Sequence, residues 1–562
     1  MKVCNDLDIE ANKKLRWDRM DRTNKVIEVK SLLAKGATKK SAAKEIGVPR
    51  TTLQYWLSRE GKTGVSSTVE AFFETSDGLA FLHQLVIAAQ FVMSKVGSCG
   101  TDLVGMFLEH SQLNQFVAGS HGHLHNMSVN MEEAILNFGE QENTDLSANM
   151  PKKKISICQD ETFHPDICLV AMEPVSNFIL LEKYDKKRDA KTWLSAMSSA
   201  LKSMPVDIIQ STSDEAKALI KYVEQELGVH HSPDLFHVQQ ELTRATTAPL
   251  QSKLKQAEAV YQASLKAKER LILTHAHYAE TNKAPCSWSE LNDEMNRAVA
   301  EIDATKKQHD EVQTYQVDVK KAKKALGDVY HPYDLNTGLA QTAEEVGNKL
   351  EANFLIIQNA AEKTWLSENS MKRLDKAHRV FKGMTNTLIF FWTMVQQQIM
   401  SLSLSPKMNC VMQDILIPGF YLQIAAKKAR NAADRHRIKK LSLEILARLE
   451  MLDDWCHLAQ PQRDKMKRIA LECAQLFQRS SSCVEGRNGY LALRHHSSHN
   501  LSDRKLRTLT IIHNYFIRRP DGTTAAERFF EKKPRDVFRY LLDNLALPAR
   551  PAKRRKEIFM AA

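Results

Sequence analysis

The segment KKKISICQDETF at 152–163 is followed by DICLVAMEP at 166–174 and NFILLEKYD at 177–185. Each contains a short apolar run bounded by turn residues. Apolar runs of this length, separated by such short turns, predict neighbouring antiparallel strands. This part of the chain therefore predicts the start of a β-sheet inside a sequence that is otherwise helical in pattern.

The pattern changes again after the third run. A helical stretch at 190–204 leads into PVDIIQSTS at 205–213, which predicts a fourth strand followed by a helix. A further short strand precedes PDLFHVQQEL at 233–242, where another helix is expected. The order of three strands, helix, strand, helix, strand and helix predicts a mixed α/β sheet.

Residues 243–480 are predicted to be helical almost throughout. The stretches at 251–273 and 289–326 are rich in charge and sparse in apolar positions, as in long antiparallel helices, and the later stretches are more apolar. HPYDLNTG at 331–338 is the clearest interruption and predicts a loop. A segment of this length is far too long for a loop, so a helical domain is expected here.

The N-terminal region predicts three short helices between about Asn24 and Glu60. Thr38 is suited to cap the second helix, Gly47 to form the turn and Pro49 to begin the third helix. This pattern resembles a helix-turn-helix, and a plain three-helix packing unit is the alternative. The residues expected to contact DNA are Lys39, Lys40, Arg50, Thr51, Thr52, Gln54, Tyr55 and Arg59.

A second helical region follows at 69–145. Six apolar residues are spaced there as a buried face, Leu103, Phe107, Leu108, Leu113, Phe116 and Val117. This region is interpreted either as a second DNA-contacting module or as a scaffold.

Composition restricts the class of protein. The formal net charge of +12 over 562 residues lowers the cost of approaching a polyanion such as DNA. The nine cysteines include no CxxC pair, which favours reduced thiols in the cytoplasm over disulfides or a zinc site. No signal peptide or membrane span is expected, because the most apolar stretch, 388–400, is interrupted by three glutamines. No GxxxxGK[ST] loop is present, so no ATPase activity is expected.

Three acidic residues are placed where metal chemistry requires them. Asp160 is predicted at the end of the first strand, and Asp214 is predicted between the fourth strand and the start of the next helix. Glu485 lies near the start of a predicted helix, with Asn488 one turn later on the same face. Carboxylates are hard ligands for Mg²⁺ or Mn²⁺, and two ions about 4 Å apart serve both oxygens of a phosphodiester displacement.

These motifs, in this order, carry a resemblance to a known family. QDETF at 159–163, STSDEAKAL at 211–219, PDLFHVQQEL at 233–242 and SSCVEGRNG at 481–489 resemble the segments of bacterial insertion-sequence transposases. The likeness runs from about residue 152 to about residue 530. It implies an RNase H-like catalytic domain that carries a helical insertion.

The resemblance also implies roles for individual residues. Asp160, Asp214 and Glu485 become the catalytic triad, which holds two Mg²⁺ or Mn²⁺ ions. Asp234 and His237 flank the site as supporting residues, together with Asn488. Arg487 and Arg494 are expected to contact DNA near the cut, and a solvated helix face is the alternative.

The whole chain is therefore predicted to be a multidomain protein, α/β plus all-α. The expected parts are a helix-turn-helix domain at 1–62, a helical DNA-binding or scaffold domain at 69–145, an RNase H-like core at 152–242 and 481–546, an all-helical insertion at 243–480 and a basic tail at 547–562.

The predicted function is that of a DNA transposase, which cuts transposon ends and joins the freed 3′-hydroxyl to target DNA. Its partners are double-stranded DNA and a second copy of the chain, and its location is the cytoplasm of a bacterium, at the nucleoid. Two alternatives stay open: an RNase H-like nuclease without strand transfer, and a domesticated transposase that acts as a DNA-binding regulator.

Overall fold

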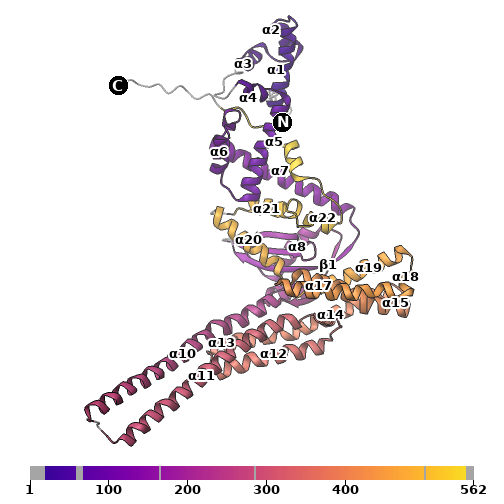
Figure 1. The fold of residues 1–562 in the computed structure, drawn as a ribbon. Helices are drawn as coiled ribbons and strands as arrows, with labels where there is room; N and C mark the ends of the chain where they lie inside the picture. Colours follow the sequence, from indigo (N-terminus) through magenta and orange to yellow (C-terminus); the bar gives the residue numbers. More distant parts are fainter. Residues whose placement is uncertain (1–18, 59–66, 164–165, 284–285, 499–500, 552–562) are drawn as a thin grey trace, which may run out of the picture.

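The computed structural model describes residues 19–58, 67–163, 166–283, 286–498 and 501–551. It contains one five-stranded mixed sheet and a much larger helical part. The sheet lies between N-terminal helices on one side and a long helical hairpin on the other (Figure 1). The prediction of a mixed α/β chain with a large helical part is confirmed.

The sheet has the strand order β3-β2-β1-β4-β5. Its strands are β1 (Lys153–Phe163), β2 (Ile167–Glu173), β3 (Phe178–Asp185), β4 (Val206–Ser213) and β5 (His230–Pro233). β1, β2 and β3 pair in antiparallel fashion, as the three apolar runs predicted. β4 pairs in parallel with β1, and β5 pairs in parallel with β4, so their carboxyl ends meet at one edge of the sheet.

The side chains of β1 point alternately to the two faces of the sheet, and each face has its own hydrophobic core. Ile155 and Ile157 belong to the core that contains α7 (His121–Ala148), α8 (Ala190–Leu201) and η4 (Tyr222–Glu226). Cys158 lies in a smaller core on the opposite face, with Val484 and Leu491 of α20 (Ser482–Ser498). Because side chains alternate along a strand, Asp160 shares the face of Cys158 and is directed towards α20.

Helices cover both edge strands, whose unpaired backbone groups would otherwise remain open. At the β3 edge, Asn514 of α21 (Asp503–Tyr515) accepts a hydrogen bond from the Ile179 amide at 2.9 Å and donates one to the Ile179 carbonyl at 3.0 Å. At the β5 edge, α14 (Phe381–Met400) packs so closely that a Cβ at Gly383 would lie 2.6 Å from Pro233. Both edge strands of the sheet are therefore covered by helices.

The N-terminal helices α1 (Arg19–Ala34), α2 (Lys39–Glu45) and α3 (Arg50–Leu57) pack around a small core of their own. Thr38 caps α2 by accepting a hydrogen bond from the Ser41 amide, as expected from the sequence. Gly47 has φ of +68°, a conformation that glycine adopts without strain. Leu53 of α3 is fully buried in this core.

The second helical region consists of α4 (Ser67–Phe72), α5 (Ser76–Ala89), η2 (Gln90–Gly97), α6 (Thr101–His110), η3 (Leu113–Gln115) and α7. Four of its predicted core residues are buried, Leu108, Leu113, Phe116 and Val117. The prediction for Leu103 is wrong, because Val104 occupies the buried face of α6 and Leu103 is exposed.

One segment in the described residues has the length and composition of a membrane span. It is Ser76–Gly97, with mean hydropathy 1.5. Leu79, Leu82 and Val86 of this segment are buried in the core shared with the sheet.

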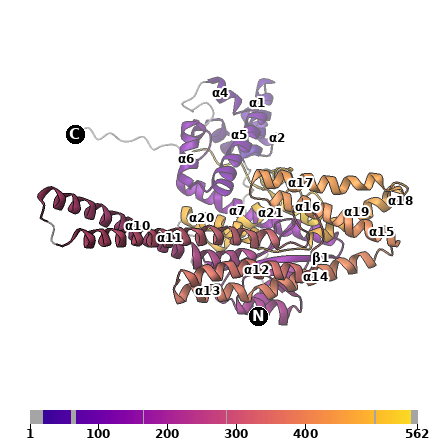
Figure 2. The ribbon, with the colours of Figure 1, turned by 60° about the horizontal axis from the view of Figure 1, so that its bottom comes forward.

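The stretch predicted to be helical, 243–480, forms helices joined by loops, with one isolated bridge between Tyr333 and Ala340 in the expected loop region. The helix expected at 233–242 is the start of α10 (Leu235–Thr281), which Asp234 caps directly after β5 and which continues past the predicted start of the insertion at 243. α10 and α11 (Trp288–Val329) form the long hairpin that projects from the molecule (Figure 2). The remaining helices are α12 (Ala343–Lys363), α13 (Glu368–Arg379), α14, α15 (Pro406–Val411), η5 (Met412–Leu416), α16 (Ile417–Lys428), α17 (Ala432–Ala447), η6 (Arg448–Met451), α18 (Asp453–Cys456) and α19 (Gln460–Gln475).

The chain then returns to the sheet through α20 and α21, and it ends with α22 (Ala525–Phe530) and α23 (Val537–Asn544). A buried ion pair holds α20 in place. Arg487 donates from Nε and Nη2 to the two carboxylate oxygens of Glu182 in β3, at 2.7 and 2.6 Å. Thr510 of α21 donates to the same carboxylate at 2.6 Å. One carboxylate therefore fixes two helices to the sheet.

This geometry corrects the prediction for Arg487. Its side chain is 3% exposed, and its Nε and Nη2 both bind Glu182, so it is not available to a DNA phosphate. Arg494 is also buried, and it donates to the backbone carbonyls of Val96 and Gly97 at the end of η2. Both arginines fix α20 to the rest of the fold.

Replacement of Arg487 by Leu is expected to destabilise the sheet by about 3–5 kcal/mol, because Glu182 would be left as an unpaired buried charge. Calorimetric unfolding of the full chain measures this decrease. Arg507→Ala is the control, since Arg507 forms an exposed pair with Glu140 at 3.0 Å, and its removal should cost less than about 1 kcal/mol. Equal stability of the Arg487 and Arg507 variants would contradict the role given to the buried pair.

Candidate functional site

Asp160 lies at the point where β1 loses its parallel neighbour. The pairing of β1 with β4 ends at Cys158 and Thr212, whereas the pairing with β2 continues to Phe163. The sequence predicted Asp160 at the end of the first strand, but the residue lies inside β1. On the side of β4, however, β1 has no paired strand at this position. The neighbouring Glu161 is directed to the opposite face, where it pairs with Arg188 at 2.9 Å and accepts from Trp193 at 3.2 Å.

α20 brings Glu485 and Asn488 to the same place. Asn488 donates from Nδ2 to Oδ2 of Asp160 at 2.8 Å, although the two residues are 328 positions apart in the sequence. The other amide atom of Asn488, Oδ1, is buried and has no hydrogen-bond partner among the described residues. An unpartnered oxygen beside a buried carboxylate is suited to a cation or a water molecule.

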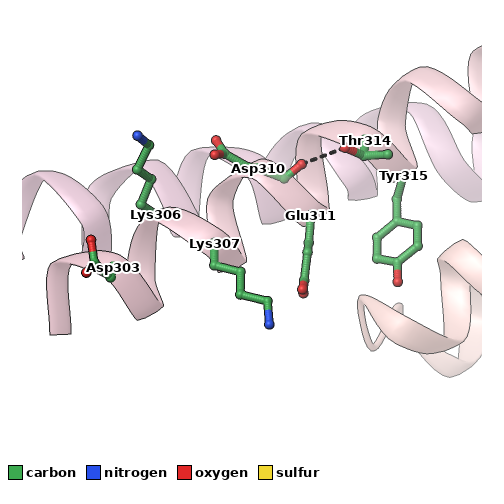
Figure 3. A pocket seen from close by; sticks show the side chains of 7 residues that line it. All are labelled: Asp303, Lys306, Lys307, Asp310, Glu311, Thr314 and Tyr315. Carbon is green, nitrogen blue, oxygen red and sulfur yellow. Dashed lines mark hydrogen bonds between the residues drawn. The ribbon is translucent and has the colours of Figure 1, made fainter. Parts of the chain in front are cut away.

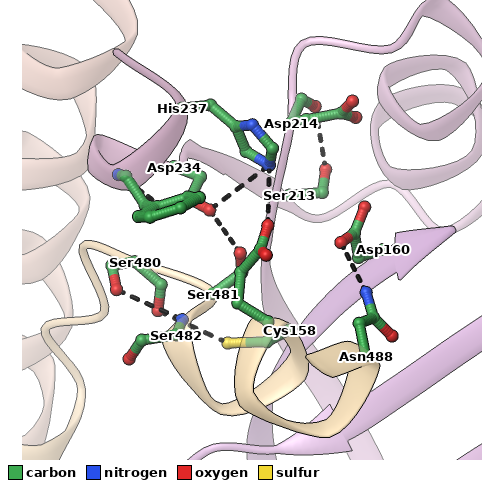
Figure 4. Close-up of polar contacts among 12 residues, drawn as sticks. Cys158, Asp160, Ser213, Asp214, Asp234, His237, Ser480, Ser481, Ser482 and Asn488 are labelled. Atoms are coloured by element: carbon green, nitrogen blue, oxygen red, sulfur yellow. Dashed lines mark hydrogen bonds and ion pairs between the residues drawn. The ribbon is translucent and has the colours of Figure 1, made fainter. Parts of the chain in front are cut away.

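The first turn of α10 supplies a third group, His237. Its Nε2 lies 3.3 Å from Oε1 of Glu485 and 3.7 Å from Oδ2 of Asp234. Asp234 caps α10 by accepting from the Phe236 amide at 2.8 Å, and it also accepts a hydrogen bond from the Ser481 hydroxyl. Figure 4 shows Asp234, His237 and Ser481 grouped on one side of the site, with Asp160 and Asn488 on the other.

The start and the end of the helical segment are joined directly beside this cluster. The Leu235 amide donates to the Arg479 carbonyl at 3.0 Å, next to the contact between Ser481 and Asp234. Arg479 in turn donates to the Gly327 carbonyl of α11 at 2.6 Å. The long helical segment thus leaves and rejoins the sheet at one point, which explains how Glu485 reaches Asp160.

Asp214 lies beside this group but is not part of it. Its Oδ1 accepts a hydrogen bond from the Ala216 amide at 3.0 Å, as in a helix-capping turn. It lines a cavity of about 180 Å³ together with Asp234 and His237, and it is near enough to Asp160 to raise the pKa of that carboxyl. Figure 4 places it on the far side of His237 from Ser481.

The residues that the structure brings together are Asp160, His237 and Glu485. One ligand atom from each lies within 4.8 Å of the others. Two carboxylates suit Mg²⁺ or Mn²⁺, while an imidazole nitrogen is a better ligand for Mn²⁺ and later transition metals than for Mg²⁺. With the buried Oδ1 of Asn488 nearby, this donor set fits one divalent cation. A second cation would require the Asp214 carboxylate to turn towards Asp160.

Burial and mutual charge change the acidity of these groups. Burial raises the pKa of Asp160 to about 7, and the neighbouring Glu485 and Asp214 contribute to the increase. The contact with Glu485 raises the pKa of His237 to about 8 against the opposing effect of burial. Burial also raises the pKa of Asp234. Three perturbed groups in one small volume are typical of a functional site.

Sequence reasoning did not identify Ser481 or the pairing of His237 with Glu485. The run of three serines before Cys483 was a usable signal, because serine is favoured where a helix begins. Ser481 accepts from the Glu485 amide through its carbonyl at 3.1 Å, so it stands at the start of α20. Its hydroxyl, however, is directed to Asp234, a partner that no local pattern indicates.

The residues predicted to contact DNA in the N-terminal helices lie on their outer surface. Lys39, Lys40, Arg50, Thr51, Gln54 and Tyr55 are exposed, and Thr52 is half-buried. Arg59 and residues 552–562 of the basic tail lie outside the described residues.

A second hollow lies away from this site. It follows the surface of α11, has a volume of about 500 Å³ and is lined by Asp303, Lys306, Lys307, Asp310, Glu311, Thr314 and Tyr315 (Figure 3). Its lining comes from consecutive turns of one helix and includes both acidic and basic side chains. The cluster at Asp160, by contrast, brings together half-buried groups from three elements, β1, α10 and α20.

Metal binding is expected to strengthen as the pH rises. Because the pKa of Asp160 is raised to about 7, the metal-free protein holds a proton at about pH 6 that a cation must displace. The proton on His237, with its pKa of about 8, adds to this competition. The affinity for Mn²⁺, measured by isothermal titration calorimetry, should rise by up to about tenfold per pH unit for each proton displaced between about pH 6 and about pH 8.

The Asp160→Asn variant should bind Mn²⁺ weakly at every pH and lack the Asp160 contribution to this dependence. An affinity of the unaltered protein that does not change over this pH range would contradict the assignment of these residues as ligands.

Comparison with known proteins gives one partial match. Residues 412–557 match a family described as a family of unknown function (DUF6399). The matched part contains Glu485 and Asn488 but not Asp160, Asp214 or His237, and it joins the last helices of the helical segment to those that pack on the sheet. No curated protein matches the chain.

Proposed function

We propose that this protein is a DNA transposase with an RNase H-like, acidic catalytic site. The observation that carries the proposal is the approach of the Asp160 and Glu485 carboxylates at the point where the central strand β1 extends beyond its pairing with β4, with His237 beside them. The strand order and directions, with β2 antiparallel and β4 and β5 parallel, support the RNase H-like assignment. The helices between β5 and α20 then correspond to the predicted insertion.

The proposed reaction is metal-dependent cleavage at a transposon end, followed by attack of the freed 3′-hydroxyl on target DNA. Mg²⁺ or Mn²⁺, when bound, polarises the phosphodiester and promotes deprotonation of the attacking water or hydroxyl. Asp160 and Glu485 are the proposed ligands, and Asp214 is the third carboxylate for a site of two ions. No protein nucleophile is required.

The other residues orient these ligands. Asn488 restrains Asp160 by its hydrogen bond, and in the metal-free protein His237 restrains Glu485 by the 3.3 Å contact between Nε2 and Oε1. Asp234 holds the start of α10 and Ser481 together, so that the helix bearing His237 and the helix bearing Glu485 keep a fixed relation. Ligands held in this way lose little freedom when the cation and the DNA bind.

The N-terminal helices are proposed to act as the helix-turn-helix that recognises the element's ends. α3 presents Arg50, Thr51 and Gln54 to solvent, while Leu53 faces the core. Lys39 and Lys40 at the start of α2 are exposed and suited to phosphate contacts. Because a transposon has two ends, a homodimer is proposed for the complex with DNA, and the proposed location is the bacterial cytoplasm at the nucleoid.

The Glu485→Gln variant should lose cleavage by about a thousandfold or more while it still binds DNA. The change retains the shape of the side chain and removes a ligand charge, and bound metal supplies several kcal/mol of transition-state stabilisation. The assay uses purified full-length protein, Mn²⁺ and a duplex carrying the inverted repeats that flank the gene.

Glu161→Gln is the matched control, because Glu161 follows Asp160 in β1 but is directed to Arg188 on the other face. Cleavage without joined products would favour the nuclease alternative. Full activity of the Glu485 variant would exclude the proposed site, and DNA binding by a protein that cuts no DNA would favour the regulator.

Alanine at Arg50 and Gln54 should weaken binding to the end sequence more than binding to unrelated DNA, by about 1–3 kcal/mol for each hydrogen-bonded pair between a side chain and a base that is removed. Fluorescence anisotropy with end and scrambled duplexes measures both affinities. Lys44→Ala is the comparison, since a lysine that contacts only phosphates should affect the two duplexes equally. If the paired alanine variant weakens both to the same extent, α3 is not the recognition helix.

A further inference from the structure

The cavity beside Asp214 is lined in part by residues that the proposed reaction does not use. Asp214, Asp234 and His237 of the site line it together with Lys376, Ala377 and Val380 from α13 and its end. Glu241 of α10 also lines this cavity. A helix of the 243–480 segment therefore borders the proposed active site directly.

Three positively charged side chains surround the single carboxylate of Glu241. Its carboxylate lies 2.9 Å from Nη1 of Arg373, 3.3 Å from Nζ of Lys376 and 3.9 Å from Nη1 of Arg244. The Glu241 side chain is 14% exposed, whereas that of Lys376 is 62% exposed and that of Arg373 is 36% exposed. Glu241 can neutralise only one of these three cations, and Lys376 and Arg373 remain partly exposed to solvent.

Lys376 is the one lysine or arginine that lines this cavity among the described residues. Glu215 lines it too, and burial and the neighbouring Asp214 raise the pKa of Glu215, while the charge of Lys376 opposes this increase. Ala216, Val238, Ala377 and Val380 provide the apolar part of the lining. An anion that entered this cavity would meet Lys376, with Arg373 beside it on α13, close to the Asp214 carboxylate of the proposed cation site.

We propose that Arg373 and Lys376, held in place by Glu241, bind a backbone phosphate of the DNA strand next to the bond that is cut. This inference rests on the proposed function, since it names a subsite of the same active site. A DNA strand places one negative charge at every nucleotide, so a phosphodiester at Asp160 and Glu485 brings further phosphates into the adjoining cavity. Arginine and lysine bind phosphate through charge-assisted hydrogen bonds.

The salt dependence of DNA binding tests this subsite. We would measure binding of a fluorescein-labelled DNA duplex to the full-length protein by anisotropy over a range of KCl concentrations, with Ca²⁺ in place of Mg²⁺. Lys376→Ala should reduce the slope of log affinity against log salt concentration by about 0.9, the value for one phosphate contact, and the double variant Arg373→Ala, Lys376→Ala should reduce it further. Lys376→Arg should retain the slope of the unaltered protein.

α13 offers a matched control in Lys372. It has the same charge on the same helix, but it pairs with Glu368 at 2.6 Å and does not line the cavity. Lys372→Ala should leave the slope unchanged. Glu241→Gln separates binding from a merely structural role, because removal of the negative charge should strengthen DNA binding, whereas removal of a purely structural interaction would weaken it.

An unchanged slope for Lys376→Ala, an equal fall for Lys372→Ala, or weaker binding by Glu241→Gln would each overturn the inference. The result is independent of catalysis. If the variants give the expected salt slopes but the protein cuts no DNA, the transposase proposal is overturned and the phosphate subsite stands. Cleavage with unchanged slopes would overturn the subsite alone.

Discussion

The arrangement of this protein depends on a buried ion pair between a strand and a helix that are far apart in the sequence. Glu182 of β3 is completely buried, and its carboxylate is bound by Arg487 of α20 and Thr510 of α21. Charges removed from water are costly unless they are paired with good geometry, so the two helices cannot shift without exposing an unpaired charge to the interior. Glu485 lies two residues before Arg487, and its position over Asp160 follows from this restraint.

A second restraint acts at the point where the helical segment leaves the sheet. The capping carboxylate of Asp234, the hydroxyl of Ser481 and the backbone contact between Leu235 and Arg479 lie together. They join the start of α10 to the start of α20. The intervening helices can therefore extend far from the sheet, as the α10–α11 hairpin does (Figure 1), while the geometry of the cluster is maintained. α13 reaches the cavity beside the cluster, which Lys376 and Asp214 both line.

The distribution of charge follows from these two restraints. The Asp160 and Glu485 carboxylates converge in a half-buried cluster, where the removal of hydration and mutual repulsion raise the pKa of Asp160, and three cations surround Glu241 nearby. A site with this pattern favours a ligand that brings both a cation and a polyanion. Nucleic acid with a divalent metal has that composition, which is why the proposed function and the phosphate subsite are consistent with each other.

Local patterns in the sequence determined the elements but not their partners. Apolar runs with turn residues between them predicted β1, β2 and β3 in the correct antiparallel arrangement, because strand pairing between neighbours depends on short-range turns. The capping residue Thr38 and the helical nature of 243–480 were likewise visible, since both depend on residues close in the chain. Only the tertiary structure decided that His237 joins Asp160 and Glu485 while Asp214 stays beside them, and that Arg487 and Arg494 are buried structural cations. These outcomes depend on which surfaces meet when distant segments pack, and the burial of an arginine or the direction of an aspartate is a property of that packing and not of the residues around it in the sequence.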